Sequence, residues 1–249
     1  MKTGILLSVR EKATRFPGKV LKPLGAGTNV TQFLLRRLLL SEQASMVCLA
    51  TSDDPRDAVL TEIAESEGAL AFRGSADDKL LRYRDAARTH GIDFVVIVDG
   101  DDPFISISHI DRIIDHAASN AGDFIMFDNL PLGATGFGLR VSALEQVCGS
   151  RPESDTEVWG SLFTEDPAYT CVSLSESDIL LARPEVRMTL DYPEDYEFFS
   201  TIVAHKAAED VTFEWVMEYL ADHPEIVEIN RDIQAAFEAH LKKSSPNNE

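Results

Sequence analysis

Short runs of apolar residues alternate along the first half of the chain with segments in which apolar residues recur every three to four positions. The runs predict buried strands, and the recurring positions predict amphipathic helices. Strands are expected at 4–9, 46–51, 69–72 and 93–98, and helices are expected after the caps Asn29, Asp54 and Asp77 and from Ser108 onward. Strands that alternate with helices are typical of right-handed βαβ units. The sequence therefore predicts an α/β fold with a mostly parallel twisted sheet and helices on both faces.

The pattern is weaker between residues 128 and 170. A glycine-rich segment at 131–138 predicts a loop over the open end of the sheet, where it would form a lid over a bound acceptor. Further strands are expected at 172–174 and 186–190, and further helices at 191–203, from Thr212 to a break at Pro224, and from Asn230 onward. We expect one domain, 1–249, with an insertion at 128–170 and a C-terminal helical extension at 209–249.

The charge balance excludes two classes of partner. The chain carries 23 Lys and Arg against 42 Asp and Glu, a formal net charge of -19. General binding to nucleic acid or to an anionic membrane needs a broad basic face, which this composition does not offer. The first apolar run stops at Arg10, too short for a membrane span or a signal peptide, so we expect a cytoplasmic protein.

Cysteine and histidine usage argues against a disulfide framework and a zinc site. The three cysteines, Cys48, Cys148 and Cys171, have no CxxC spacing, and Cys48 lies in an apolar run as a core residue. The six histidines show no metal-ligand spacing and are expected mostly at the surface. The chemistry of the chain must therefore come from other residue types.

A cationic segment follows the first predicted strand. Residues 1–22 contain six basic side chains and one acidic side chain, Glu11. Arginine offers forked donors to phosphate oxygens, lysine offers a mobile point charge, and the Pro17-Gly18 pair permits a sharp turn beside a ligand. A bound polyphosphate would suit this loop, although a solvated basic loop would have the same composition.

An acidic turn, Asp99-Gly100-Asp101-Asp102, follows the strand predicted at 93–98. Carboxylates at the carboxyl end of a buried parallel strand point into the crevice where open α/β sheets bind ligands. Mg²⁺ prefers one or two carboxylates together with phosphate oxygens and water. The alternative is an ordinary turn whose aspartates cap the next helix.

Four motifs carry a resemblance to a known family. The segments are Arg15-Phe16-Pro17-Gly18-Lys19 with Leu21, Gly100-Asp101-Asp102-Pro103-Phe104-Ile105, Leu190-Asp191-Tyr192-Pro193-Glu194-Asp195-Tyr196, and the run FRGSADDKLLRY at 72–83. Together they resemble the sugar-acid cytidylyltransferases, a group that includes 3-deoxy-manno-octulosonate and acylneuraminate cytidylyltransferases and the spore-coat polysaccharide protein F type. The last motif is similar to the spore-coat branch in particular.

The resemblance implies a Rossmann-like nucleotide-diphospho-sugar transferase fold and transfer of CMP from CTP to an acidic sugar. It assigns Mg²⁺ to Asp101 and Asp191, with Asp99 and Asp102 as weaker candidates. It implies catalytic contacts to the triphosphate from Arg10, Arg15 and Lys19, and further nucleotide contacts from Ser8, Gly18, Thr51, Arg73 and Ser75. It also implies a homodimer with 128–170 at the interface.

The resemblance fails where the acceptor is expected to bind. The segment 136–140 reads Gly-Phe-Gly-Leu-Arg, whereas the spore-coat branch has acidic and aromatic residues there and the octulosonate branch a histidine. Two other hypotheses therefore stay open. The Asp99-Gly100-Asp101 sequence is also the D-x-D of a glycosyltransferase of the same fold, and a relative without an acceptor site would bind CTP without turnover.

Overall fold

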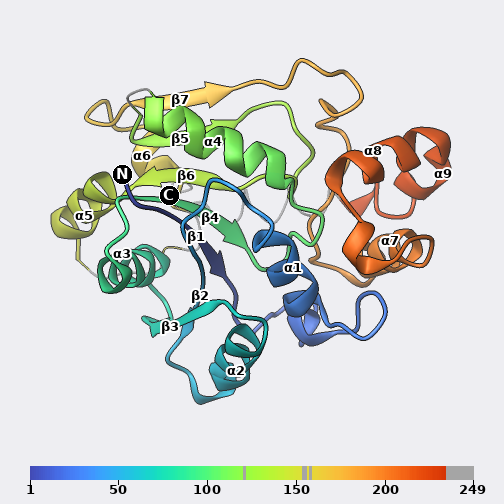
Figure 1. The fold of residues 1–249 in the computed structure, drawn as a ribbon, viewed down its shortest axis with the longest axis horizontal. Helices are drawn as coiled ribbons and strands as arrows, with labels where there is room; N and C mark the ends of the chain where they lie inside the picture. The colour runs from blue at the N-terminus through green and yellow to red at the C-terminus, as the bar shows by residue number, and fades with distance from the viewer. Residues whose placement is uncertain (120–121, 153–155, 157–158, 234–249) are drawn as a thin grey trace, which may run out of the picture.

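The computed structural model describes residues 1–119, 122–152, 156 and 159–233, and the chain folds around a mixed sheet (Figure 1). In this described part the strands are β1 Thr3–Ser8, β2 Val47–Ser52, β3 Leu70–Gly74, β4 Phe94–Asp99, β5 Phe124–Phe127, β6 Phe137–Arg140 and β7 Cys171–Leu174. Their spatial order is β3-β2-β1-β4-β6-β5-β7. Only β6 runs antiparallel to its neighbours β4 and β5, so the predicted mostly parallel α/β fold is confirmed.

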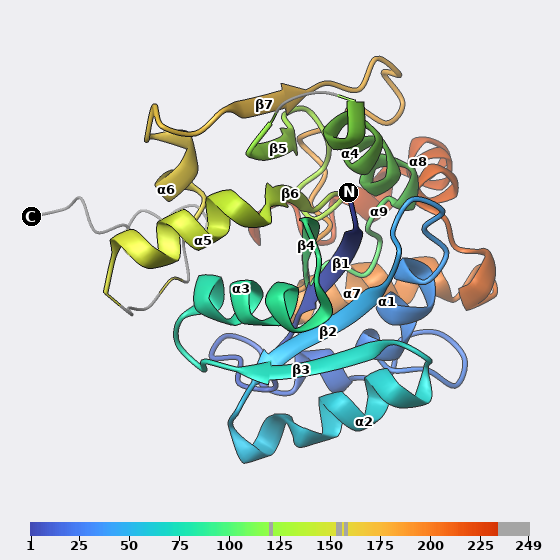
Figure 2. The ribbon, with the colours of Figure 1, turned by 60° about the vertical axis from the view of Figure 1, so that its left-hand side comes forward.

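Helices cover both faces of the sheet. They are α1 Val30–Leu38, α2 Ala58–Ser66, α3 Lys79–His90, α4 Ile107–Ser119, α5 Val141–Ser150, α6 Ser161–Thr164, α7 Pro193–Val203, α8 Phe213–Asp222 and α9 Pro224–Val227, with short 3₁₀ turns η1 Lys19–Leu21, η2 Pro55–Asp57 and η3 Ala208–Asp210. Figure 2 shows α3 and α5 on one side of the sheet and α1 and α4 on the other. None of the helices in the described ranges combines the length and apolar character needed to cross a bilayer.

The period-two alternation of strand side chains builds two core layers. On β1, Ile5 and Leu7 join the layer beneath α1 and α4, whereas Leu6 joins the layer beneath α3 and α5. All six residues of β1 are buried, which explains why its central residues form a continuous apolar run. Cys48 lies in the second layer, fully buried, as its apolar context predicted.

Most predicted helix boundaries are confirmed. Asn29 caps α1 through a capping box with Gln32, and Thr212 caps α8 by accepting a hydrogen bond from the Trp215 amide. One predicted cap and one predicted helix start are each wrong by one residue. Asp78, not Asp77, caps α3 by accepting from the Leu81 amide, and α4 begins at Ile107, ahead of Ser108.

The strand predicted at 186–190 is wrong. This segment is buried, but its only ladder contact in the described residues is an isolated bridge between Arg187 and Leu132. Its amides bond to loops instead, from Met188 to the Leu132 carbonyl at 2.8 Å and from Leu190 to the Asp101 carbonyl at 2.7 Å. The apolar run therefore reflects burial between loops, which periodicity cannot distinguish from a central strand.

The loop predicted at 131–138 is partly wrong, because Phe137 and Gly138 belong to β6. A Cβ at Gly138 would clash with the side chains of Ile113 and Phe94, so this glycine marks a close approach of strand and helix. The pattern also missed α5. The helix predicted from Asn230 onward lies largely outside the described residues, although Asn230 itself is buried.

His109 is an exception to the expectation that most histidines lie at the surface. Its imidazole is buried, with Nδ1 2.6 Å from the Ser106 hydroxyl and Nε2 2.9 Å from a Glu176 carboxylate oxygen. Glu176 also pairs with Arg112. Burial lowers the pKa of His109 more than the Glu176 carboxylate raises it. Burial raises the pKa of Glu176, but hydrogen bonds from the Asp178 amide, Arg112 and His109 outweigh it and lower the pKa to about 2.

Both groups bind protons less readily in the folded chain than in the unfolded chain, so the unfolding free energy should fall on acidification. The His109 contribution is lost as the pH falls below about 6.5, and the Glu176 contribution is lost between about 4.3 and its folded pKa. Urea unfolding between pH 7 and pH 3 should show a shallower acid limb for Glu176→Gln. The matched control Glu225→Gln, an exposed side chain paired with His223, should keep the wild-type slope.

Candidate active site

Three segments that are far apart in sequence meet at the carboxyl edge of the central strands. Ser8 and Asp99 are register partners on β1 and β4, so the loops that follow these strands leave the sheet side by side. The Gly100 amide donates to the Ser8 carbonyl at 2.8 Å, and a Cβ on Gly100 would lie 2.6 Å from the Val9 Cβ. The third segment, 186–191, joins them through the hydrogen bond from the Leu190 amide to the Asp101 carbonyl.

A cavity of about 540 Å³ opens where these segments meet. The basic loop lines one part of it with Arg10, Lys12, Arg15 and Lys19. Carboxylates, the loop before β6 and the first residue of β6 line the remainder, chiefly Asp99, Asp101, Asp102, Asp191, Leu132, Thr135 and Phe137. The cavity thus combines a cationic wall with a carboxylate floor, as expected for a polyphosphate and a hard cation.

Lys19 lies between the two carboxylates that the sequence assigned to a metal. Its ammonium donates to Asp101 Oδ2 at 2.6 Å and to Asp191 Oδ1 at 2.9 Å. Burial lowers the pKa of Lys19, but Asp101 and Asp191 outweigh it and raise the pKa to about 12. Because one ammonium contacts both side chains, Asp101 and Asp191 face the same point in the cavity.

The turn at Gly18 places Lys19 there. Gly18 has φ 70°, a left-handed conformation that favours glycine, and η1 starts at the next residue. The Lys19 amide donates to the Phe16 carbonyl at 3.2 Å, and the Thr31 hydroxyl of α1 donates to the Val20 carbonyl at 2.8 Å. The backbone beside the cavity is therefore anchored, whereas the lysine side chain keeps its flexible stem.

A buried network holds Asp191 in place. Asp195 is fully buried and accepts from the amides of Asp191 and Tyr192 at 2.9 and 3.0 Å, from Arg187 and from Asn230. Arg187 also reaches Asp191 Oδ2 at 3.4 Å. Burial raises the pKa of Asp191, but Lys19 and Arg15 outweigh it and keep the pKa below its usual value. The carboxylate is thus held ionised and fixed in direction.

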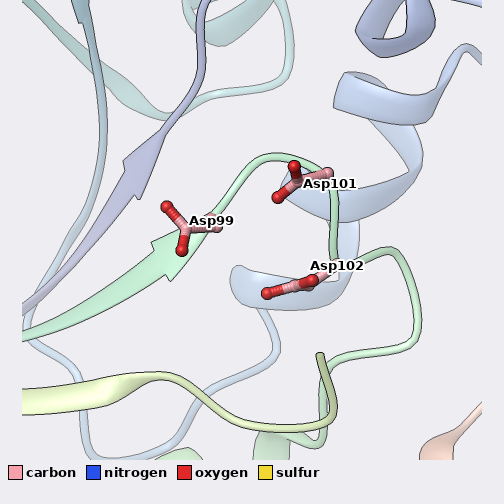
Figure 3. A group of neighbouring side chains, drawn as sticks. All are labelled: Asp99, Asp101 and Asp102. Atoms are coloured by element: carbon pink, nitrogen blue, oxygen red, sulfur yellow. The ribbon is translucent and has the colours of Figure 1, made fainter. Parts of the chain in front are cut away.

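A second group of carboxylates lies beside this pair. Asp99, Asp101 and Asp102 bring one oxygen each to within 4.8 Å of one another, with Asp99 at the end of β4 and the other two in the following loop (Figure 3). Burial, reinforced by Asp101 and Asp99, raises the pKa of Asp102 well above its usual value. Asp101 belongs both to this cluster and to the pair that contacts Lys19, and hard oxygen donors gathered in this way fit a divalent cation such as Mg²⁺.

The other predicted nucleotide contacts divide into two sets. Ser8 and Arg10 line the cavity, where the Ser8 hydroxyl accepts from Tyr83 at 2.6 Å and Arg10 donates to the Ala76 carbonyl at 2.6 Å. Among the described residues, Gly18, Thr51, Arg73 and Ser75 are outside the lining. Thr51 is fully buried, Arg73 donates to the carbonyls of residues 52–54, and Ser75 accepts from the Asp78 amide. Their role stays a prediction.

Comparison with known proteins identifies the family of this chain. The profile of a family described as cytidylyltransferase matches residues 5–153, more than half of the chain. The chain belongs to the cytidylyltransferase family. The match covers the basic loop, β1 to β6 and the acidic turn, and it ends before Asp191.

Relatives and solved structures agree with this placement. The chain is 27% identical to the spore coat polysaccharide biosynthesis protein SpsF of Bacillus subtilis over 228 residues, covering 88% of this chain and 94% of that protein. It is 33% identical to an 8-amino-3,8-dideoxy-manno-octulosonate cytidylyltransferase of Shewanella frigidimarina over 132 residues, 51% of each chain. The structure of a cytidylyltransferase from Leptospira borgpetersenii superposes with a TM-score of 0.82 at 28% identity, covering 91% and 97% of the two chains.

Sequence reasoning missed part of the site of this cytidylyltransferase. It did not single out Arg187, although a lone arginine in the apolar run 186–190 signals a buried charge that needs partners. It also grouped Lys2 with the basic loop. Lys2 lies at the opposite end of β1, where its ammonium donates to the His90 carbonyl at 2.7 Å.

Loss of the Asp195 carboxylate should destabilise the fold as well as the site. Asp195→Ala leaves the buried Arg187 without its main partner, and breaking a buried ion pair costs about 3–5 kcal/mol. We expect urea unfolding to show a loss of this size. The neighbouring Glu194→Ala removes an exposed carboxylate from the same turn and should change the unfolding free energy by less than about 1 kcal/mol. Equal effects of the two substitutions would contradict this assignment.

Proposed function

We propose that this cytidylyltransferase transfers CMP from CTP to a hydroxyl group of an acidic sugar. The acceptor oxygen attacks the α-phosphorus and loses its proton to solvent, the bond from that phosphorus to the bridging oxygen breaks, and pyrophosphate leaves with the electron pair. The observation that carries the proposal is the convergence of Asp101 and Asp191 on one cationic position beside a wall of basic side chains. The names of the relatives support an acidic sugar acceptor and a role in surface polysaccharide synthesis.

The residues of the cavity divide the work between phosphate binding and cation binding. Arg10, Arg15 and Lys19 would hold the triphosphate, and Lys19 would meet the charge that develops on the leaving pyrophosphate. Asp101 and Asp191 would hold Mg²⁺, which when bound polarises the α-phosphate and lowers the pKa of a bound hydroxyl. Positioning and charge neutralisation would then account for most of the rate, since phosphoryl transfer needs little covalent chemistry from the protein.

The proposal includes three further elements from the family resemblance. They are contacts to the nucleotide from Ser8, Gly18, Thr51, Arg73 and Ser75, a homodimer with 128–170 at the interface, and a cytoplasmic location. Leu132 and Thr135 of the loop before β6, with Phe137 at the start of that strand, line the part of the cavity that would be left for the acceptor.

Pyrophosphate release tests the reaction class directly. The full chain is incubated with Mg²⁺, each of the four ribonucleoside triphosphates, and a panel of octulosonic and nonulosonic acids. We expect release with CTP and one acceptor, and a CMP-linked product by mass spectrometry. In a parallel incubation with nucleotide sugars in place of the triphosphates, release of free nucleoside diphosphate would indicate a glycosyltransferase instead. CTP binding without turnover on any acceptor would indicate a binding protein.

Lys19→Ala should lower turnover by at least ~100-fold, the scale of losing one preorganised electrostatic contact in an active site. The expected defect lies in kcat, because the contact strengthens as charge builds on pyrophosphate. Lys206→Ala removes a lysine whose ammonium lies over the Trp215 ring, away from the cavity, and should leave kcat unchanged. A near-normal rate for Lys19→Ala would remove this residue from the mechanism.

A further inference from the structure

Lys19 has two tasks that it cannot perform from one position. The proposed function needs its ammonium on the phosphates, yet the structure has it bonded to Asp101 at 2.6 Å and Asp191 at 2.9 Å. Those are the carboxylates that the proposed function assigns to the divalent cation. We propose that the Lys19 ammonium and the divalent cation occupy the same position in turn, and that the nucleotide phosphates draw Lys19 out. This inference rests on the proposed metal site.

The hydrogen bonds of the two carboxylates show why occupancy must be exclusive. Asp191 Oδ1 accepts from both Arg15 and Lys19, at 2.6 and 2.9 Å, and Asp191 Oδ2 lies 3.4 Å from Arg187. The Lys19 side chain is only 10% exposed. A dication that bridged Asp101 and Asp191 would therefore meet an ammonium in contact with both, and like charges at that distance repel strongly.

The local structure allows the exchange without backbone movement. Gly18 and the hydrogen bond from the Lys19 amide to the Phe16 carbonyl anchor the turn. The four-carbon stem of lysine can still rotate its ammonium toward the basic side of the cavity, which Arg10 and Lys12 line. Phosphates bound on that side offer new anionic partners, so the ammonium does not lose its neutralisation when it leaves the carboxylates.

The exchange keeps the carboxylates paired in both states. Without nucleotide, Lys19 neutralises Asp101 and Asp191, and with nucleotide the divalent cation does so. Nucleotide binding and cation binding are then positively coupled, and linkage requires each to raise the affinity of the other by the same factor. Lys19 thus lowers the cation affinity of the nucleotide-free protein, whereas a lysine that only supported the structure of the site would not lower it.

Mn²⁺ binding to the full chain without nucleotide, measured from the free-ion EPR signal, tests this exchange. Lys19→Met should raise the Mn²⁺ affinity roughly 10-fold or more, the scale of removing one close charge contact. Lys12→Met removes the same charge from an exposed position in the same cavity, without a contact to either carboxylate among the described residues, and should have a much smaller effect. Adding Asp191→Asn to Lys19→Met should abolish the gain.

A second Lys19 variant and a measurement with CTP distinguish failure of the exchange from failure of the proposed metal site. Lys19→Gln, which keeps a polar side chain, should show the same gain, and unfolding midpoints establish that each variant is folded. CTP should raise Mn²⁺ affinity more in the wild type than in Lys19→Met. Equal or weaker Mn²⁺ binding by both folded Lys19 variants, with CTP-dependent binding intact in the wild type, would overturn the exchange alone. No Mn²⁺ binding by the wild type even with CTP would overturn the proposed metal site as well.

Discussion

The site depends on one electrostatic constraint, the gathering of four carboxylates at the edge of the sheet. Asp99, Asp101 and Asp102 follow β4, and Asp191 approaches from the segment 186–191. Two like charges 4 Å apart repel by about 4 kcal/mol at an effective dielectric of about 20. The folded chain relieves this repulsion in two ways: the raised pKa of Asp102 favours its neutral form, and Lys19 of the basic loop places a cation between Asp101 and Asp191. The loop and the carboxylates are thus parts of one arrangement.

The topology explains why these segments meet. The parallel strands β1 and β4 are adjacent, so the loops that follow them leave from the same edge of the sheet. The reversed direction of β6 brings the loop before it to this edge as well, because a chain entering an antiparallel strand starts where its neighbour ends. The network of Asp195, Arg187 and Asn230 then fixes the segment 186–191 that carries Asp191.

The sequence predicted the parallel half of the sheet well because its strands are buried on both faces and its helices have clear caps. It also predicted that Asp101 and Asp191 converge, from two motifs of the resembling family. It could not predict which partner they take in the folded chain, since the contact with Lys19 depends on a side-chain conformation. It failed at 186–190, where burial between loops produces the apolar run of a strand. It also failed at β6, where the close approach at Gly138 requires a glycine and so gives the strand the composition of a loop.

The departure from the family pattern at 136–140 has a structural explanation for most of its length. Gly138 is required by the close approach of Ile113 and Phe94, Leu139 is buried in the layer beneath α3 and α5, and Arg140 donates to the Gly122 carbonyl at 3.1 Å. Only Phe137 of this strand lines the cavity. The altered residues therefore maintain the sheet, which leaves Phe137 and the preceding loop to contact the acceptor that we propose. There, Leu132 and Phe137 keep 37% and 36% of their surface exposed.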